Sequence, residues 1–280
     1  ENDLESKAIA EMLEREGEKF LVTNQAWGAR WEGHFDEKKQ EWQGMEIENI
    51  DEIKKALEEN IEVYGVELQG SFEGGDVINI DHHKYWDDDR SNEKSSIEQV
   101  AEILGIELNF FEQFISANDK GYIPAMQRLG IEKNLDEDKI QSIIEVIREY
   151  DRKMQGVTPE QEVQAQEAVK KLGDLSERQD YILVEDLPHS KTSTITDRLY
   201  GKYDNLLITS QDGETNFYGS AKIIEELNKQ FPGGWSGGEL DKGNGFWGGY
   251  ANQENIKKEV QKIIEQNRKE KEEKDEIYRD

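Results

Sequence analysis

Cysteine is absent from the 280-residue sequence, which excludes disulfide bonds, thiolate metal sites and a cysteine nucleophile. Any bound metal ion must therefore be held by carboxylates and imidazoles, and the chain has only four histidines. Basic residues are also in short supply: 35 Lys and Arg stand against 63 Asp and Glu, and the formal net charge is -28. Long duplex nucleic acid is a poor partner for such a surface, because like charges repel.

Long apolar runs are missing too. No stretch approaches the roughly 18 consecutive apolar residues that a transmembrane helix requires, and no basic segment followed by an apolar one marks a signal peptide at the N-terminus. We therefore expect a soluble, cytoplasmic protein that does not bind membranes. Charged residues make up 35% of the chain, but nine Phe, ten Tyr and six Trp favour packed domains over disorder.

Strands alternating with helices in the first part of the chain predict a mostly parallel α/β sheet. The elements expected there are a helix at 2–18, a strand at 19–25, a helix at 49–60 capped by Asp51, strands at 61–68 and 75–83, and a helix at 95–105 that begins at Ser95 or Ser96 and ends at Gly105. Two further helices cover 109–126 and 138–156, with an interruption expected between Gly121 and Pro124.

The second part of the chain begins with a helix at 158–173, for which Thr158 is the expected cap and Pro159 the first residue. It continues with strands at 180–187, 205–211 and 215–220, a hairpin turn at Gln211-Asp212-Gly213, a helix at 221–231, a glycine-rich loop at 232–250 and a helical segment from 252 that frays in a charge run.

The stretch "VINIDHHKYW" places two of the four histidines, His82 and His83, next to Asp81 at the end of an expected strand. In open α/β sheets, ligands bind beyond the carboxyl ends of the strands. An arbitrary Asp-His-His is more often a hydrogen-bonded surface turn, so the neighbouring segments decide its meaning.

The order of those segments resembles the DHH phosphoesterase family, which includes single-strand-specific exonucleases, oligonucleotide and cyclic-dinucleotide phosphodiesterases, exopolyphosphatase and manganese pyrophosphatase. The strand "VYGVEL" is followed by "VINIDHH", the helix "SSIEQVAEILG" and then "ISANDKGYI", where the family places another metal-binding aspartate. Further on, "YILVEDL", "NLLITSQDGETNFYGSAKIIEELNKQF" and "GGWSGG" look like the smaller C-terminal substrate domain of the family. The resemblance covers roughly residues 19–250.

This resemblance implies that Asp81 is a metal ligand shared between two Mn²⁺ or Mg²⁺ ions and that His82 is a nitrogen ligand. His83 would face the substrate phosphate as the catalytic histidine. Asp119 matches the later aspartate ligand, and Glu67 stands where the family usually has an aspartate. Two cations can hold a hydroxide, lower its pKa and neutralise charge on the attacked phosphate, and they would reverse the repulsion between an acidic protein and a phosphorylated substrate.

The sequence departs from the family pattern after the first expected strand. The family has a histidine and two closely spaced aspartates there, whereas Asn24, Trp27 and Ala29 stand at those places here. The candidate substitutes follow a few residues later and are Glu32, His34 and Asp36. A solvated loop at 31–37 is an equally good interpretation, so the number of metal ions, one or two, and turnover itself depend on this stretch.

The glycine-rich stretch departs as well, because the family motif closes with a histidine where this chain has Trp235. The backbone N–H groups of such a loop can still bind a phosphate, although glycine-rich turns are more often only turns. The substrate-binding candidates are Gly233, Gly234, Gly237 and Gly238, with Ser220 and Lys222 in place of a serine and a basic contact of the family, and with Phe246 and Trp247 as stacking surfaces for a base. His189 is expected to be exposed and without a chemical role.

We therefore expect an α/β protein with a mostly parallel-sheet, DHH-type metal-binding domain at 1–155, a helical linker at 156–175 and a smaller α/β substrate domain at 176–250. A charged helix and tail should follow at 251–280, the site is expected in the cleft between the domains, and a homodimer is left open.

The expected function is metal-dependent hydrolysis of a small nucleotide, a cyclic dinucleotide or a short single-stranded oligonucleotide by a metal-bound hydroxide. A catalytically impaired nucleotide-binding or regulatory protein that retains the fold is the alternative. In a third interpretation, the Asp-His-His tripeptide is a coincidence in a structural or interaction protein, but the ordered resemblance of the second domain disfavours that.

Overall fold

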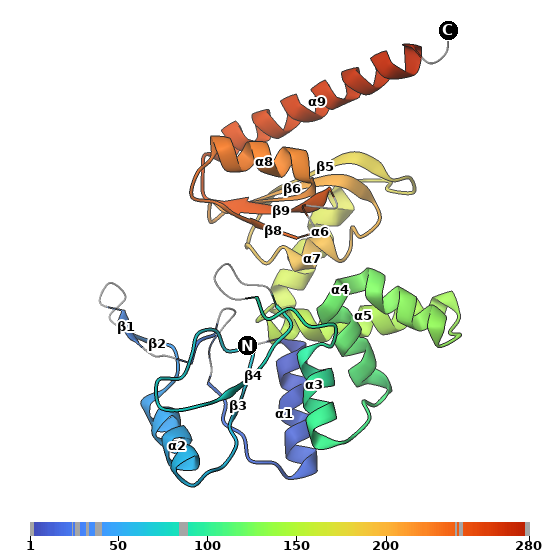
Figure 1. Cartoon of the computed structure of the whole chain (residues 1–280). Coiled ribbons are helices and arrows are strands. Elements are labelled where there is room, and N and C mark those ends of the chain that lie inside the picture. Colours follow the sequence, from blue (N-terminus) through green and yellow to red (C-terminus); the bar gives the residue numbers. More distant parts are fainter. Residues whose placement is uncertain are drawn as a thin grey trace. The chain divides into compact units, whose positions relative to one another are not determined.

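The computed structural model describes residues 3–23, 25, 29–31, 34–36, 41–83, 89–238, 240 and 243–277, with the backbone alone at 34–36, 41–43 and 270–277. The chain divides into two compact units, Glu1–Gly156 and Val157–Asp280, and each has a hydrophobic core of its own (Figure 1). The helix expected as a linker and the expected C-terminal helix both fall within the second unit.

The first unit combines helices with very short strands. Their bounds are α1 Leu4–Glu16, β1 His34–Asp36, β2 Glu41–Gln43, α2 Ile47–Glu58, β3 Tyr64–Val66, β4 Ile78–Ile80, α3 Ser96–Leu104, α4 Phe110–Glu132 and α5 Glu137–Met154.

Local sequence signals set several helix ends in this unit. A capping box between Ser95 and Glu98 starts α3, and Gly105, with a left-handed φ of 68°, ends it, as predicted. The helix expected at 49–60 forms as α2, but its predicted cap was wrong, because the helix begins after Glu46 without a side-chain cap and Asp51 lies inside it.

The strands of the first unit confirm the predicted parallel pairing in part. β3 and β4 are parallel, and Arg30 forms a parallel bridge with Gln69 just beyond β3. β1 and β2 form an antiparallel pair. The strand expected at 19–25 does not form, since the described residues 19–23 and 25 have no strand pairing. The fold is thus mixed α/β, and the extent of a mostly parallel sheet in this unit is not confirmed.

Two cores flank these parallel segments, because side chains alternate along a strand. Val66 and Ile80 pack with α1, α3, α4 and α5 on one side. On the other side, Val63 and Val77, each three residues earlier, pack against a cluster that contains residues of α2 together with Leu68, Trp31 and Ala29. Figure 1 shows α1 and α3 side by side in this unit.

The second unit is built on a single mixed sheet. The bounds of its elements are α6 Pro159–Lys171, β5 Gln179–Leu187, α7 Ser193–Thr196, β6 Tyr203–Ser210, β7 Thr215–Ser220, α8 Ala221–Gln230, β8 Trp235–Gly237, β9 Asn244–Gly249 and α9 Gln253–Ile277. The strand order is β5-β6-β7-β9-β8, and β5–β6 is the parallel pair in it, whereas the other neighbours are antiparallel. The predicted glycine-rich loop contains β8 and β9 and is therefore partly a hairpin.

Helices cover both faces of this sheet (Figure 1). Leu206 and Ile208 of β6 face a core shared with α6 and α7. Leu207, between them, faces the opposite core, which contains residues of α8 and α9. α6 thus buries Ala165 against the sheet, and the first part of α9 buries Ile256 rather than standing free in solvent.

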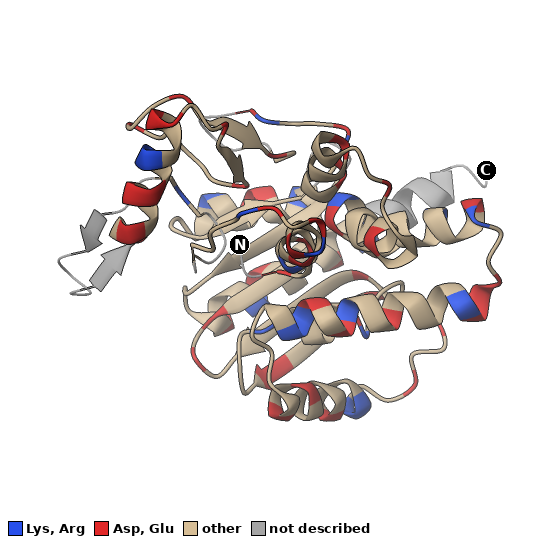
Figure 2. Cartoon of the chain, turned by 90° about the horizontal axis from the view of Figure 1, so that it is seen from below, with Lys and Arg blue, Asp and Glu red and all other residues tan. Residues whose placement is uncertain are grey.

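Acidic residues are spread over the helices of both units, with basic residues interspersed among them (Figure 2). Among the described residues, no helix has the length and apolar character that crossing a membrane would require.

Candidate metal centre

The first element of the site is Glu67, directly after β3. Its side chain is 2% exposed, and its backbone has a left-handed φ of 54°, which a non-glycine residue adopts only at a cost. The hydroxyl of Ser96, at the start of α3, donates to Glu67 Oε1 at 2.9 Å. The end of β3 and the N-terminus of α3 thus fix this carboxylate together.

Asp81, His82 and His83 follow β4 directly, as predicted. Asp81 is buried, and its Oδ1 accepts from the backbone N–H of His82 at 2.8 Å and of His83 at 3.0 Å. The same oxygen lies 3.0 Å from Nδ1 of His83. In this arrangement Asp81 shapes the turn and orients His83, while the two imidazoles lie with their centroids 4.2 Å apart.

Asp119 comes from α4, immediately before the predicted interruption of that helix. Gly121 and Tyr122 have non-helical backbone angles, and φ of Tyr122 is 56°. Strained backbone of this kind concentrates at functional sites. The break ends the first part of α4 beside Asp119, and the C-terminal end of a helix favours a cation nearby.

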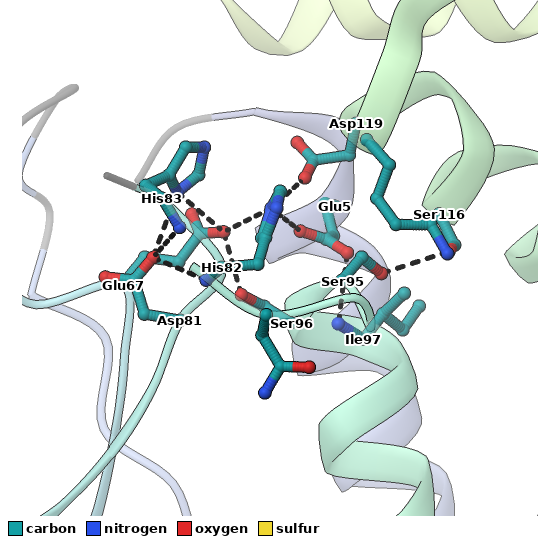
Figure 3. Close-up of polar contacts among 12 residues, drawn as sticks. Glu5, Glu67, Asp81, His82, His83, Ser95, Ser96, Ile97, Ser116 and Asp119 are labelled. Carbon is teal, nitrogen blue, oxygen red and sulfur yellow. Dashed lines mark hydrogen bonds and ion pairs between the residues drawn. The ribbon is translucent and has the colours of Figure 1, made fainter. Parts of the chain in front are cut away.

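Four groups converge in the folded chain (Figure 3). Glu67, His82, His83 and Asp119 each offer one ligand atom, and these atoms all lie within 4.8 Å of one another. His82 Nε2 forms an ion pair with Asp119 Oδ2 and lies 3.8 Å from Glu67 Oε1. Residues from the ends of two strands and from one helix, distant in sequence, are thus brought to a single point.

Glu5 of α1 also reaches this point, and the sequence analysis did not single it out. Its carboxylate is 2% exposed, and Oε2 lies 3.9 Å from His82 Nε2. Acidic residues are common in the first turn of any helix, so "DLES" carries no signal that separates this glutamate from an ordinary one.

The electrostatics of the site reflect crowded, buried acids. Burial, with the charges of Asp119 and Glu67, raises the pKa of the Glu5 carboxyl well above its ordinary value. Burial and the charge of Asp119 likewise raise the pKa of Glu67. The hydrogen bond with Asp81 raises the pKa of His83 to about 9, although burial acts in the opposite direction. Without a bound cation, these shifts favour neutral carboxyl groups and a protonated His83.

The donor set fits a divalent cation. Glu5 Oε2 is buried and has no hydrogen-bond partner among the described residues; His82 Nε2 and Asp119 Oδ2 are also buried and contact each other as an ion pair, without a hydrogen bond of normal geometry. Unpaired polar atoms in a protein interior are costly unless an ion or a ligand satisfies them. Carboxylate oxygens with imidazole nitrogens suit Mn²⁺, and the oxygens alone suit Mg²⁺.

A polar cavity of about 200 Å³ adjoins this cluster within the first unit. It is lined by Asp3, Glu5, His83, Asn118, Asp119, Arg148, Asp151 and Gln155. Arg148 is held by Asn118 Oδ1 at 3.0 Å and by Asp151 Oδ2 at 2.6 Å, and its guanidinium lies over the ring of Tyr122. The cavity thus has one guanidinium among its carboxylates, and that guanidinium is already paired with Asp151.

Among known proteins, similarity to this chain is found only at the level of solved structures, and it is low. No family model matches the sequence, and no curated protein matches it. Among solved structures, this chain is similar to a crystal structure of exonuclease RecJ bound to manganese, at 12% sequence identity and a TM-score of 0.32. The similarity covers 79% of this chain and 73% of that one. A likeness of this degree does not establish a function.

The substitutes predicted for the missing aspartates are placed only in part. His34 and Asp36 lie at the two ends of β1, whose side chains are not described, and Glu32 lies outside the described residues. Asn24 and Trp27 also lie outside them. Ala29, which stands at the place of an aspartate, is 2% exposed and belongs to the core around Trp31.

The substrate-binding candidates of the second unit have structural contacts. Lys222 donates to Asn267 of α9 at 2.9 Å, and the backbone N–H of Ser220 donates to Asn205. Gly234 and Gly237 belong to the closely packed hairpin, where a Cβ would meet the rings of Trp247 and Phe246, respectively. Gly233 and Gly238 have left-handed φ angles of 97° and 90°. These contacts explain the glycines structurally, and their role in binding phosphate stays a prediction.

The aromatic residues of the hairpin differ in exposure. Trp247 is fully buried in the core, so the prediction that it is a stacking surface for a base was wrong. Phe246 and Trp235 are partly exposed. The prediction that His189 is exposed was also wrong, because this residue is buried and its Nε2 lies 3.1 Å from the carbonyl of Gln161.

Proposed function

We propose that this chain is a phosphoesterase that depends on Mn²⁺ or Mg²⁺ and hydrolyses a small nucleotide, a cyclic dinucleotide or a short single-stranded oligonucleotide. The convergence of Glu67, His82, His83 and Asp119 carries this proposal. The ordered resemblance to DHH phosphoesterases supports the reaction class. A formal net charge of -28 favours a compact substrate over a long polyanion.

The two histidines take different roles in this proposal. The side chain of His82 is 8% exposed and lies among three carboxylates, which suits an inner metal ligand. His83 is 33% exposed and lines the cavity. Held by Asp81, it is placed to donate a hydrogen bond to a phosphate oxygen that enters the cavity.

The remaining residues hold or compensate charge. Glu67 and Asp119 bind the ion, and Asp81 keeps the turn that presents both histidines. A bound divalent ion supplies an activated water and neutralises the charge that develops on the phosphate. Arg148 adds a positive group on the cavity wall.

The proposal is tested by measuring hydrolysis after metal ions have been removed from the protein and then restored. Mn²⁺ or Mg²⁺ is added back with a panel of linear dinucleotides, cyclic dinucleotides, pyrophosphate and 3′-phosphoadenosine phosphate. We expect metal-dependent hydrolysis that is lost in His82→Ala and in Asp81→Ala/His82→Ala. Glu102→Gln, an exposed acid on α3, is the matched control and should keep full activity. Absence of hydrolysis across the panel in saturating Mn²⁺ would contradict the enzyme.

The alternative is a nucleotide-binding or regulatory protein without turnover. One observation favours it: at one place where the family has an aspartate, Ala29 is a core residue. Nucleotide binding by calorimetry, with no product formed after prolonged incubation, would establish this alternative.

A further inference from the structure

Glu5 is held in place by the start of α1. Asp3 caps the helix by accepting from the backbone N–H of Ser6 at 2.8 Å, and the N–H of Leu4 donates to Asp151 at 3.4 Å. Ala8 and Met12, further along α1, are buried in the core of the first unit. The first turn of the helix therefore presents Glu5 from a fixed backbone.

The two oxygens of Glu5 have different surroundings. Oε1 accepts from the backbone N–H of Ile97, in the first turn of α3, at 3.0 Å. Oε2 is buried and has no hydrogen-bond partner within the described part of the chain. A buried carboxylate oxygen without a partner costs free energy, so an ordinary structural glutamate would not be expected to keep it.

The Glu5 carboxylate points at the four candidate metal ligands, as Figure 3 shows. Its Oε2 lies 3.9 Å from His82 Nε2, the atom around which Glu67 and Asp119 also gather. Among the described residues, no Lys or Arg forms an ion pair with Glu5, Glu67 or Asp119. Three acids therefore share one small volume in which imidazole is the only basic group that the described contacts provide.

The cavity gives this volume room for an ion. Glu5, His83 and Asp119 all line it, and its volume is about 200 Å³. A water molecule occupies roughly 30 Å³ in the liquid, so an ion with several waters fits without displacing a side chain.

We propose that Glu5 is a further metal ligand, which binds the divalent ion through Oε2 and supplies a carboxylate in place of those missing at 24–29. This inference rests on the metal centre of the proposed function and deepens it. It also makes α1 part of the centre: the ion connects the first turn of this helix to the ends of β3 and β4 and to α4.

Glu5→Gln tests the assignment, because a glutamine oxygen can still accept from Ile97 while the negative charge is lost. We expect the affinity for Mn²⁺, measured by calorimetry on metal-stripped protein, to fall about tenfold or more. Glu11→Gln is the matched control on the same helix, since Glu11 is exposed and pairs only with Lys7 among the described residues, and it should bind Mn²⁺ like the wild type.

A second measurement reports the number of water ligands on the bound ion instead of its affinity. The luminescence lifetime of bound Tb³⁺ in H₂O and D₂O reports the number of coordinated waters, which should rise by about one in Glu5→Gln as a water replaces the carboxylate oxygen. Wild-type Mn²⁺ affinity and an unchanged water count in this variant would overturn the proposal. So would a variant whose only change is a lower melting temperature, with and without metal alike.

If Glu5→Gln does not fold, a crystal of the wild type in excess Mn²⁺ decides. Oε2 within coordination distance of the ion supports the proposal, and an ion bound without Glu5 overturns it. The proposed function fails on a different result. If Mn²⁺ binding requires Glu5 but no substrate is hydrolysed, the proposed activity is refuted, and Glu5 is still a metal ligand. Absence of Mn²⁺ binding by the wild type overturns both.

Discussion

At the scale of single residues, the geometry of the candidate centre depends on the hydrogen bonds that Asp81 accepts. One oxygen of this buried side chain accepts from the backbone N–H groups of His82 and His83 and contacts the His83 ring. The resemblance to DHH phosphoesterases implies that Asp81 is a metal ligand, which stays a prediction, and in this structure its Oδ1 organises the turn. The ligand atoms that do converge belong to Glu67, His82, His83 and Asp119.

The stability of the metal-free protein should fall as the pH rises. The folded-state pKa of His83 is raised to about 9 from 6.5, so its stabilising contribution is complete below pH 6.5 and is lost as the pH rises through 9. The raised pKa of Glu67 acts in the same direction, because its charge disfavours the folded state above the ordinary value of 4.5. Thermal unfolding in a chelator should therefore give a lower melting temperature at about pH 9 than at about pH 6.

His83→Gln is the control for this pH dependence. Because the variant lacks the titrating imidazole, the fall in melting temperature between the two pH values should be smaller than in the wild type. An equal fall in both proteins would assign the effect to other groups.

At the scale of elements, local signals and long-range contacts account for different parts of the fold. The ends of α3 and the start of α6 follow from capping residues a few positions away, such as Ser95 with Glu98 and Thr158 with Gln161. The strand expected at 19–25 fails, because parallel pairing depends on a distant partner. Residues 29–31 pair instead, where Trp31 packs on Gly65 and donates to Asn79 at 2.7 Å.

Gly65→Ala should disrupt the packing of Trp31 on β3 and destabilise the protein. A Cβ at Gly65 would overlap the indole ring of Trp31, and overpacking of this kind costs about 3 kcal/mol. Gly17→Ala is the matched control: Gly17 has a left-handed φ of 77° but open space around it, so it should cost only about 1 kcal/mol. Denaturant unfolding of both variants measures the difference, and equal costs would show that Trp31 does not pack on β3.

At the scale of the whole molecule, the candidate metal ligands all belong to one unit. Glu67, His82, His83 and Asp119 all belong to Glu1–Gly156, and so do the residues that line the adjoining cavity. The second unit has separate cores on the two faces of its own sheet. A metal ion that binds only folded protein stabilises the unit that holds it.

Mn²⁺ should therefore protect the first unit selectively. In hydrogen–deuterium exchange, we expect slower exchange at 64–68, 78–83 and 96–119 when Mn²⁺ is present, and unchanged exchange at 179–187 and 203–220. His82→Ala should abolish the protection. Equal slowing throughout the second unit in the wild type would contradict a centre built from the first unit alone.

The sequence by itself determined what depends on neighbouring residues and on residue type. Absence of cysteine limited the metal ligands to carboxylate and imidazole, the caps placed α3 and α6, and β-branched runs predicted β3 to β7 near their observed positions. Tertiary structure alone decided which side chains meet. It brought Glu5 to His82 and buried His189 and Trp247. Such contacts join residues far apart in the chain, and packing, which no local pattern encodes, selects them.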